Sequence, residues 1–94
     1  SGKASGNLYQ HLIDGCRAGD QKSQFQIYKL YYKAMFNTSL MIVNDSMQAH
    51  DIIQESFLSA FEIIDTYPAS VSFDAWLGKI VLSRSLDAIM SDRC

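Results

Sequence analysis

The sequence is poor in the residues that break helices and in the patterns that build sheets. Its 94 residues include one proline and five glycines. No alternation of polar and apolar residues is long enough for a half-buried strand, so the pattern favours an all-α fold. No apolar run approaches the roughly 18–20 residues that a membrane-spanning helix needs, and the N-terminus lacks the apolar core of a signal peptide.

The sequence also has few cysteines and a small net charge. Cys16 and Cys94 lie far apart, which is no disulfide framework and is typical of a reducing compartment, so we expect a cytoplasmic protein. The formal net charge of −2 does not favour a strongly basic nucleic-acid-binding module. A hydrophobic share of 48% argues against disorder. Residues 1–7 are small and polar and predict a flexible end or a cloning remnant, and residues 8–94 predict one small helical domain.

The apolar spacing predicts three long helices and one short one. The expected helices cover residues 8–17, 21–43, 46–65 and 73–91, and the loop 66–72 contains the single proline. Asp20, Asp45 and Ser72 precede the three long helices and supply side-chain acceptors for N-caps. Gly15 and Gly19 are expected to limit the short helix. The predicted fold is all-α, a compact bundle of three long helices plus a short N-terminal helix.

The segment 21–43 is apolar around much of its circumference. Its stripe and the residues that widen it are Phe25, Tyr28, Tyr32, Met35, Phe36 and Val43, with Ile27, Leu30, Tyr31, Ala34, Met41 and Ile42. A helix of this kind must contact several neighbours. We therefore predict that it is the central helix of the bundle.

The segment 46–65 has two different faces. The face expected to be buried consists of Ala49, Ile52, Ile53, Phe57, Ala60, Ile63 and Ile64. The opposite face is acidic, carries an amide and exposes a leucine; its members are Asp51, Gln54, Glu55, Leu58 and Glu62. The first face predicts a core seam, and the second predicts a surface that faces solvent or a partner.

The acidic face has two chemical interpretations. Asp51 and Glu55 lie four residues apart on one helical face, where two carboxylates could hold a metal ion or share a proton. The Glu-x-x-His pattern of di-metal bundles is missing, and no second set of ligands occurs on another helix. We therefore favour a solvated or partner-binding face and expect no metal and no cofactor.

Other reactive residues give no case for an enzyme. Arg17 beside Cys16 favours a lowered thiol pKa, but no constellation of His and Asn accompanies the thiol. No glycine-rich phosphate loop and no nucleophile elbow is present. His50 flanks the apolar stripe and is predicted to be a surface or half-buried histidine, and His11 has no better support as a ligand.

Trp76 also has two interpretations. With Phe73 and Ile80 it could form an aromatic platform for an unstacked base. It lies in phase with Leu77 and Ile80, however, and this spacing favours a place in the core. We adopt the core interpretation.

Three blocks of sequence follow one another in a defined order. They are Phe25-x-x-Tyr28-x-x-Tyr31-Tyr32-x-x-x-Phe36, then Ala49-x-Asp51-Ile52-Ile53-Gln54-Glu55-x-Phe57-Leu58, then Phe73-x-Ala75-Trp76-Leu77-x-x-Ile80 with Asp87. Together they resemble region two of bacterial sigma factors, with the extracytoplasmic-function group as the nearest match. The resemblance runs from about Leu12 to Asp87 and so covers most of the chain.

The resemblance implies a role in transcription initiation. In this family, the acidic helix face docks on the clamp helices of the largest subunit of core RNA polymerase. The polymerase-binding residues implied here are Asp51, Gln54, Glu55 and Leu58, with Met47 and Glu62 at the edge. The family then uses the following loop and the last helix to melt the promoter at its minus-ten element and to hold a flipped base of the non-template strand. The DNA-binding residues implied here are Tyr67, Ser70, Ser72, Lys79, Ser83 and Arg84.

The chain departs from the family pattern in ways that bear on DNA. Ser83 stands where the family usually has Asn, and a hydroxyl replaces only part of the two-way hydrogen bonding of an amide. The last helix is neutral, with Lys79, Arg84 and Arg93 balanced by Asp74, Asp87 and Asp92. We therefore expect weak DNA binding in isolation. The helix-turn-helix domain of the family is absent from the sequence, which predicts a fragment or an unusually short protein.

An alternative function remains open at this point. A sigma-like helical module could bind polymerase, or an anti-sigma factor, without contacting DNA. The neutral last helix favours this alternative, whereas the acidic face is compatible with both functions.

Overall fold

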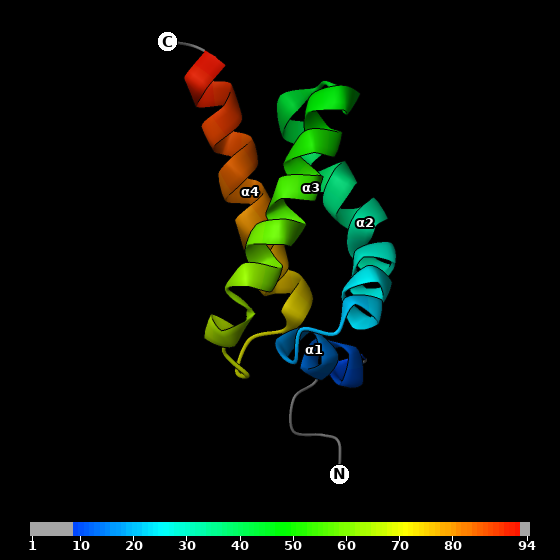
Figure 1. Cartoon of the computed structure of the whole chain (residues 1–94). Helices are drawn as coiled ribbons and strands as arrows, with labels where there is room; N and C mark the ends of the chain where they lie inside the picture. The colour runs from blue at the N-terminus through cyan, green and yellow to red at the C-terminus, as the bar shows by residue number, and fades with distance from the viewer. Residues whose placement is uncertain (1–8, 93–94) are drawn as a thin grey trace.

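Four α-helices and one short 3₁₀ turn make up the described part of the chain, residues 9–92 of a computed structural model (Figure 1). The elements are α1 (Gln10–Arg17), α2 (Gln21–Val43), α3 (Ser46–Glu62), η1 (Ile64–Thr66) and α4 (Phe73–Asp92). No strand occurs between residues 9 and 92, and the predicted all-α fold is confirmed. The expectations for residues 1–7, for Leu8 as the first helical residue and for Cys94 lie outside the described residues.

Side-chain caps begin the second and third helices, as predicted. The Asp20 carboxylate accepts hydrogen bonds from the Ser23 backbone N–H at 3.1 Å and from the Ser23 hydroxyl at 2.7 Å, and these bonds lower the pKa of Asp20. The Asp45 carboxylate accepts from the Gln48 N–H at 3.1 Å. Asn44 ends α2 in the left-handed region, with φ of 55°, and donates its N–H to the carbonyl of Leu40. These local signals explain why the predicted bounds of α2 are confirmed at both ends.

Gly15 lies inside α1, so the expectation that it limits this helix is wrong. A Cβ atom at Gly15 would lie 2.0 Å from the Ser23 Oγ and 2.6 Å from the Ser23 Cβ. The glycine is therefore required by the close approach of α1 to the first turn of α2. Gly19, with φ of +80°, lies in the turn between the two helices.

Helix α2 packs against α1, α3 and α4, which confirms its predicted central place (Figure 1). The buried core is formed by Ile13, Cys16, Ile27, Met35, Ile53, Phe57, Ala60, Ile64, Tyr67, Phe73, Leu77 and Val81. Four residues that were expected to widen the buried stripe of α2, or to lie on it, are exposed instead: Phe25, Leu30, Ala34 and Met41. The buried surface of α2 is therefore narrower than its apolar composition indicates.

Helix α3 ends earlier than predicted, at Glu62, and the chain continues as the 3₁₀ turn η1. A 3₁₀ turn has about 3.0 residues per turn in place of 3.6, so the helical phase is lost at this point. As a result Ile64 is buried, whereas Ile63 is 44% exposed and does not belong to the core seam. The 3.6-residue pattern also missed Ser56, which is fully buried on α3.

Small polar residues are buried where α2 and α4 meet. The Ser85 hydroxyl lies 2.8 Å from the Ser39 hydroxyl of α2 and 2.8 Å from the carbonyl oxygen of Val81. Both hydroxyls are fully buried. Their mutual hydrogen bond offsets the cost of removing them from water, and their small size lets the two helices approach closely.

Phe57→Ala is expected to destabilise the fold by about 3–5 kcal/mol, because its 2% exposed ring leaves a cavity in the core. The matched control is Leu58→Ala, one residue further along the same helix. Leu58 is 69% exposed, so its truncation should change stability by only about 0.5 kcal/mol. Urea denaturation of the three chains measures both changes. Equal losses for Phe57→Ala and Leu58→Ala would contradict the assignment of the two faces.

Candidate functional site

The polymerase-binding residues predicted from the resemblance lie together on the outer face of α3. Six of six are exposed: Met47, Asp51, Gln54, Glu55, Leu58 and Glu62. They recur at three- and four-residue intervals along the helix, so they form one continuous stripe. The stripe combines two apolar side chains with three carboxylates and an amide. An arrangement of this kind suits docking against a basic helical partner.

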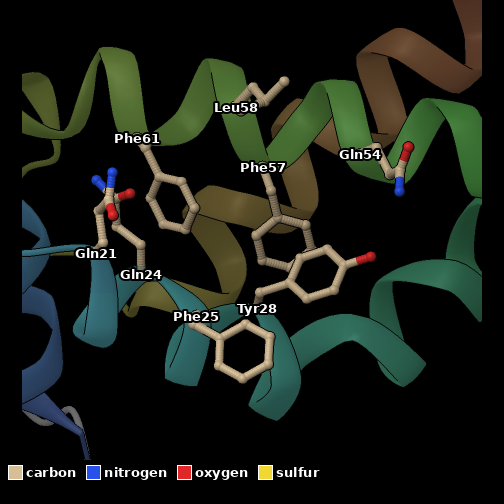
Figure 2. Close-up of a pocket in the computed structure, with 8 residues that line it drawn as sticks. All are labelled: Gln21, Gln24, Phe25, Tyr28, Gln54, Phe57, Leu58 and Phe61. Atoms are coloured by element: carbon tan, nitrogen blue, oxygen red, sulfur yellow. The ribbon is translucent and has the colours of Figure 1, made fainter.

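An apolar groove of about 440 Å³ lies beside this stripe, between the first half of α2 and α3. Its lining residues are Gln21, Gln24, Phe25, Tyr28, Gln54, Phe57, Leu58 and Phe61. Figure 2 shows the aromatic side chains of α2 and α3 facing one another across the groove; the Tyr28 and Phe57 rings meet edge to face with centroids 4.8 Å apart. Gln54 and Leu58 belong to both the stripe and the groove, which makes the two surfaces continuous.

Phe25 is the part of this surface that sequence reasoning missed. It was placed on the core stripe of α2 because its spacing fits that stripe, but it is exposed at the rim of the groove. The Lys29 ammonium lies 5.0 Å from the centroid of the Phe25 ring. No local signal distinguishes a rim phenylalanine from a core one, because both fit the same helical period.

A second groove, of about 570 Å³, lies on the surface where α3 and α4 meet. Its lining residues are Ser59, Trp76, Lys79, Ile80, Ser83, Arg84 and Asp87. The structure thus brings together Lys79, Ser83 and Arg84 of the predicted DNA-binding set. Ser70 and Ser72 are exposed in the loop before α4 and do not line this groove.

Trp76 packs against the core, as predicted, and also lines the second groove. It packs against the core cluster, with its ring centroid 5.7 Å from that of Phe73 and 5.2 Å from that of Tyr67. It is only half-buried, and its remaining surface lines the groove between α3 and α4.

Ser72 occupies the predicted N-cap position of α4, where its carbonyl accepts the N–H of Trp76 at 3.1 Å.

Arg84 connects the two predicted binding sets. Its Nη1 donates to the Glu55 carboxylate at 3.4 Å, and its Nη2 donates to the Ser59 hydroxyl at 2.5 Å. The ion pair is partly solvated, with 41% of the Arg84 side chain and 65% of the Glu55 side chain exposed. A residue predicted to contact DNA is therefore held by a residue predicted to contact polymerase.

Tyr67 is buried, with 4% of its surface exposed, although it was predicted to contact DNA. Its ring lies against Phe73 and Trp76, and its hydroxyl donates to the carbonyl of Val71. Its own carbonyl accepts from Nη2 of Arg17 at 3.1 Å. The Tyr67 side chain thus packs under the loop and hydrogen-bonds to its backbone. The exposed residues of the loop are 68–72.

The cysteine and histidine considered as reactive groups lie outside both grooves. Burial, with a smaller contribution from Asp20, raises the pKa of the Cys16 thiol to about 11, so the expected lowering by Arg17 is wrong. His50 is exposed, and its Nδ1 lies 3.0 Å from the Tyr32 hydroxyl. Between residues 9 and 92, no three His, Cys, Asp or Glu side chains come close enough to hold a metal ion. Within the same range, no helix has the length and apolarity to cross a membrane.

Comparison with known proteins gives a family match over most of the chain. The family model described as Sigma-70 region 2 matches residues 27–93. The ECF RNA polymerase sigma factor SigW of Bacillus subtilis is 27% identical over 82 residues, which cover 87% of this chain and 44% of that protein. The RNA polymerase sigma-H factor of Pseudomonas aeruginosa is 21% identical over 82 residues, which cover 87% of this chain and 42% of that protein. The chain therefore spans less than half the length of these curated relatives. These matches confirm the resemblance stated from the sequence, including the extracytoplasmic-function group.

The Arg84–Glu55 pair is expected to contribute a small but measurable coupling energy. Because both side chains are partly solvated, a double-mutant cycle with Glu55→Gln and Arg84→Ala should give about 0.2–1 kcal/mol. Chemical denaturation of the four chains measures this coupling. Glu62→Gln combined with Arg84→Ala is the matched control, because Glu62 lies on the same helix face and its effect should be additive. A Glu55 coupling no larger than the Glu62 value would contradict the pairing.

Proposed function

The chain belongs to the sigma-70 region 2 family, and on this premise we propose that it acts in transcription initiation by binding core RNA polymerase and reading an unpaired promoter strand. The observation that carries the proposal is the exposure of all six predicted polymerase contacts on one face of α3, on a helix whose other face is in the core. The site of action proposed is the cytoplasm, where core polymerase is found. The proposal assigns no catalysis, metal or cofactor to the chain.

The proposed polymerase interface is the stripe from Met47 to Glu62. Leu58 supplies an exposed apolar anchor, with Met47 at the edge of the stripe, and a few residues near the centre of an interface usually supply most of its binding energy. Asp51, Glu55 and Glu62 surround them with negative charge, which attracts and orients a basic partner. The adjoining groove between α2 and α3 extends the apolar surface that clamp helices would cover.

The proposed DNA site combines the exposed loop residues 68–72 with the groove between α3 and α4. In this proposal Lys79 contacts a phosphate, and Ser83 and the loop contact an unstacked base. The proposal is supported by the groove that Lys79, Ser83 and Trp76 line together. Flipping a base costs least when the strand is already single. We therefore propose a single strand, and not a duplex, as the preferred ligand.

The alternative, an interaction module for polymerase or an anti-sigma factor that does not contact DNA, is supported by a specific observation. Arg84 already has acidic and hydroxyl partners on α3, and Asp87 lines the same groove. The groove therefore has little uncompensated positive charge with which to attract phosphates. Strand binding in the presence of polymerase distinguishes the two functions.

Asp51→Ala and Leu58→Ala are each expected to weaken binding to core polymerase by about tenfold, the effect of losing a contact worth about 1.4 kcal/mol. Titration of labelled chain with core polymerase, followed by fluorescence anisotropy, measures the loss. Met41→Ala is the control for Leu58→Ala, because Met41 is an exposed apolar residue of α2 outside the stripe. Asp14→Ala on α1 controls for the lost charge. The thermal midpoints should stay close to that of the parent chain, and parent-like binding by both stripe variants would overturn the interface.

Lys79→Ala and Ser83→Asn are expected to affect strand binding in different ways. Loss of a phosphate contact should weaken a matched and a scrambled strand equally and reduce the salt slope by about 0.7. Ser83→Asn restores an amide that can donate to and accept from a base edge, so it should tighten the matched strand more than the scrambled one. Anisotropy titrations at two salt concentrations, with the chain bound to core polymerase, test both. No preference of the parent complex for the matched strand would favour the alternative without DNA.

A further inference from the structure

Arg17 connects α1 to the loop that leads into α4. Its Nη2 donates to the carbonyl oxygen of Tyr67 at 3.1 Å, and its guanidinium carbon lies 5.7 Å from the centroid of the Tyr67 ring. The two residues are 50 positions apart in sequence. In Figure 1, α1 and this loop lie at the same end of the bundle. One planar cation thus contacts both the backbone and the ring of the residue at the base of the loop.

The geometry of the loop depends on Tyr67. The Tyr67 hydroxyl donates to the carbonyl of Val71, and the Val71 N–H donates to the carbonyl of Pro68 at 3.2 Å. These two bonds fix the path of the exposed residues between positions 68 and 71. A shift of Tyr67 would therefore move the backbone between positions 68 and 71.

Helix α1, which carries Arg17, is held in place by close packing. Ile13 and Cys16 of α1 are buried in the core, and Gly15 lies so close to Ser23 that a single added methyl group would collide with it. Helix α1 also packs against η1, which precedes the loop. Arg17 is the last residue of α1, where a cation interacts favourably with the helix dipole.

We propose that Arg17 is a positioning residue for strand recognition, which acts through Tyr67 to hold the loop in the conformation that receives an unstacked base. This inference rests on the proposed function, because it assigns recognition to the loop. It adds α1 to the recognition apparatus, although α1 precedes the segment, residues 27–93, that the family model matches. Ordering the loop before the strand arrives reduces the entropy that binding must offset.

Two other roles for Arg17 give different results in experiments. A direct phosphate contact would add affinity for any strand and would steepen the salt dependence. A purely structural role would stabilise the bundle without changing the choice between strands. A positioning role changes that choice and the rigidity of the loop while leaving the salt slope unchanged.

The test uses the full chain with Arg17→Ala, Arg17→Lys and a charge control, Lys33→Ala. Lys33 is an exposed cation of α2, so its removal changes the net charge by the same amount. Two quantities are measured for each chain. The first is the backbone ¹⁵N order parameter of Ser70 and Val71, with Gln54 of α3 as the internal reference. The second is the affinity of the polymerase-bound chain for matched and scrambled single strands at two salt concentrations.

We expect the order parameters of Ser70 and Val71 to fall from about 0.85 to below about 0.6 in Arg17→Ala, with Gln54 unchanged. The affinity for the matched strand should fall by about tenfold, the effect of a lost hydrogen bond to a charged group. The affinity for the scrambled strand and the salt slope should not change. Arg17→Lys keeps the charge but loses the planar fork, so it should show the same changes to a smaller extent. Lys33→Ala should show none of them.

Three results would overturn the inference. Unchanged order parameters of Ser70 and Val71 in Arg17→Ala would overturn it, whatever the strand affinities are. Equal losses for both strands, with a salt slope reduced by about 0.7, would make Arg17 a phosphate contact. A looser loop with unchanged strand preference would make its role structural. The proposed function itself fails if the polymerase-bound parent chain shows no preference for the matched strand. That result would also remove the positioning role of Arg17. If Arg17→Ala does not fold, Arg17→Lys is judged by the same results.

Discussion

The conformation of the loop between η1 and α4 depends on the burial of Tyr67. Its ring lies against Phe73 and Trp76 of α4, and its carbonyl accepts a hydrogen bond from Arg17 of α1. Phe73 in turn contacts Tyr31 of the central helix, with ring centroids 5.5 Å apart. Removal of the Tyr67 ring would therefore loosen the loop from α4 directly and would remove the ring contact with Arg17 of α1. A residue with only 4% of its surface exposed thus matters to a proposed surface function.

The helices and their caps were predictable because their signals are local in sequence. Asp20 and Asp45 cap α2 and α3 as expected, since a carboxylate next to free N–H groups needs no distant partner. Prediction failed where a helix ends earlier than its apolar period indicates and where packing against other helices decides burial. Ile63 fits the apolar period of α3 but is exposed because the chain turns into η1, and Ser56 is buried despite its hydroxyl because neighbouring helices cover it. Periodicity describes one helix and carries no information about its neighbours.

The candidate site divides in the same way. Burial of one face of α3 places the opposite face outside, so the exposure of Asp51 and Leu58 followed from the pattern. The contact from Arg17 to Tyr67 spans 50 positions, and the contact from Arg84 to Ser59 spans 25. No periodic signal marks such pairs. The long-range contacts that organise the loop and the α3–α4 groove therefore had to come from the structure.

The ion pair between Glu55 and Arg84 has a consequence for how two ligands bind together. A cation that displaces Arg84 from Glu55 frees the guanidinium, and an anion that displaces Glu55 from Arg84 frees the carboxylate. Whichever ligand binds first breaks the pair, and the second ligand does not have to break it again. Linkage requires the benefit to be the same in both orders, and the strength of the pair limits it to about 1 kcal/mol, or about fivefold in affinity. On the proposed function, a polymerase contact at Glu55 and a strand contact at Arg84 would thus strengthen each other.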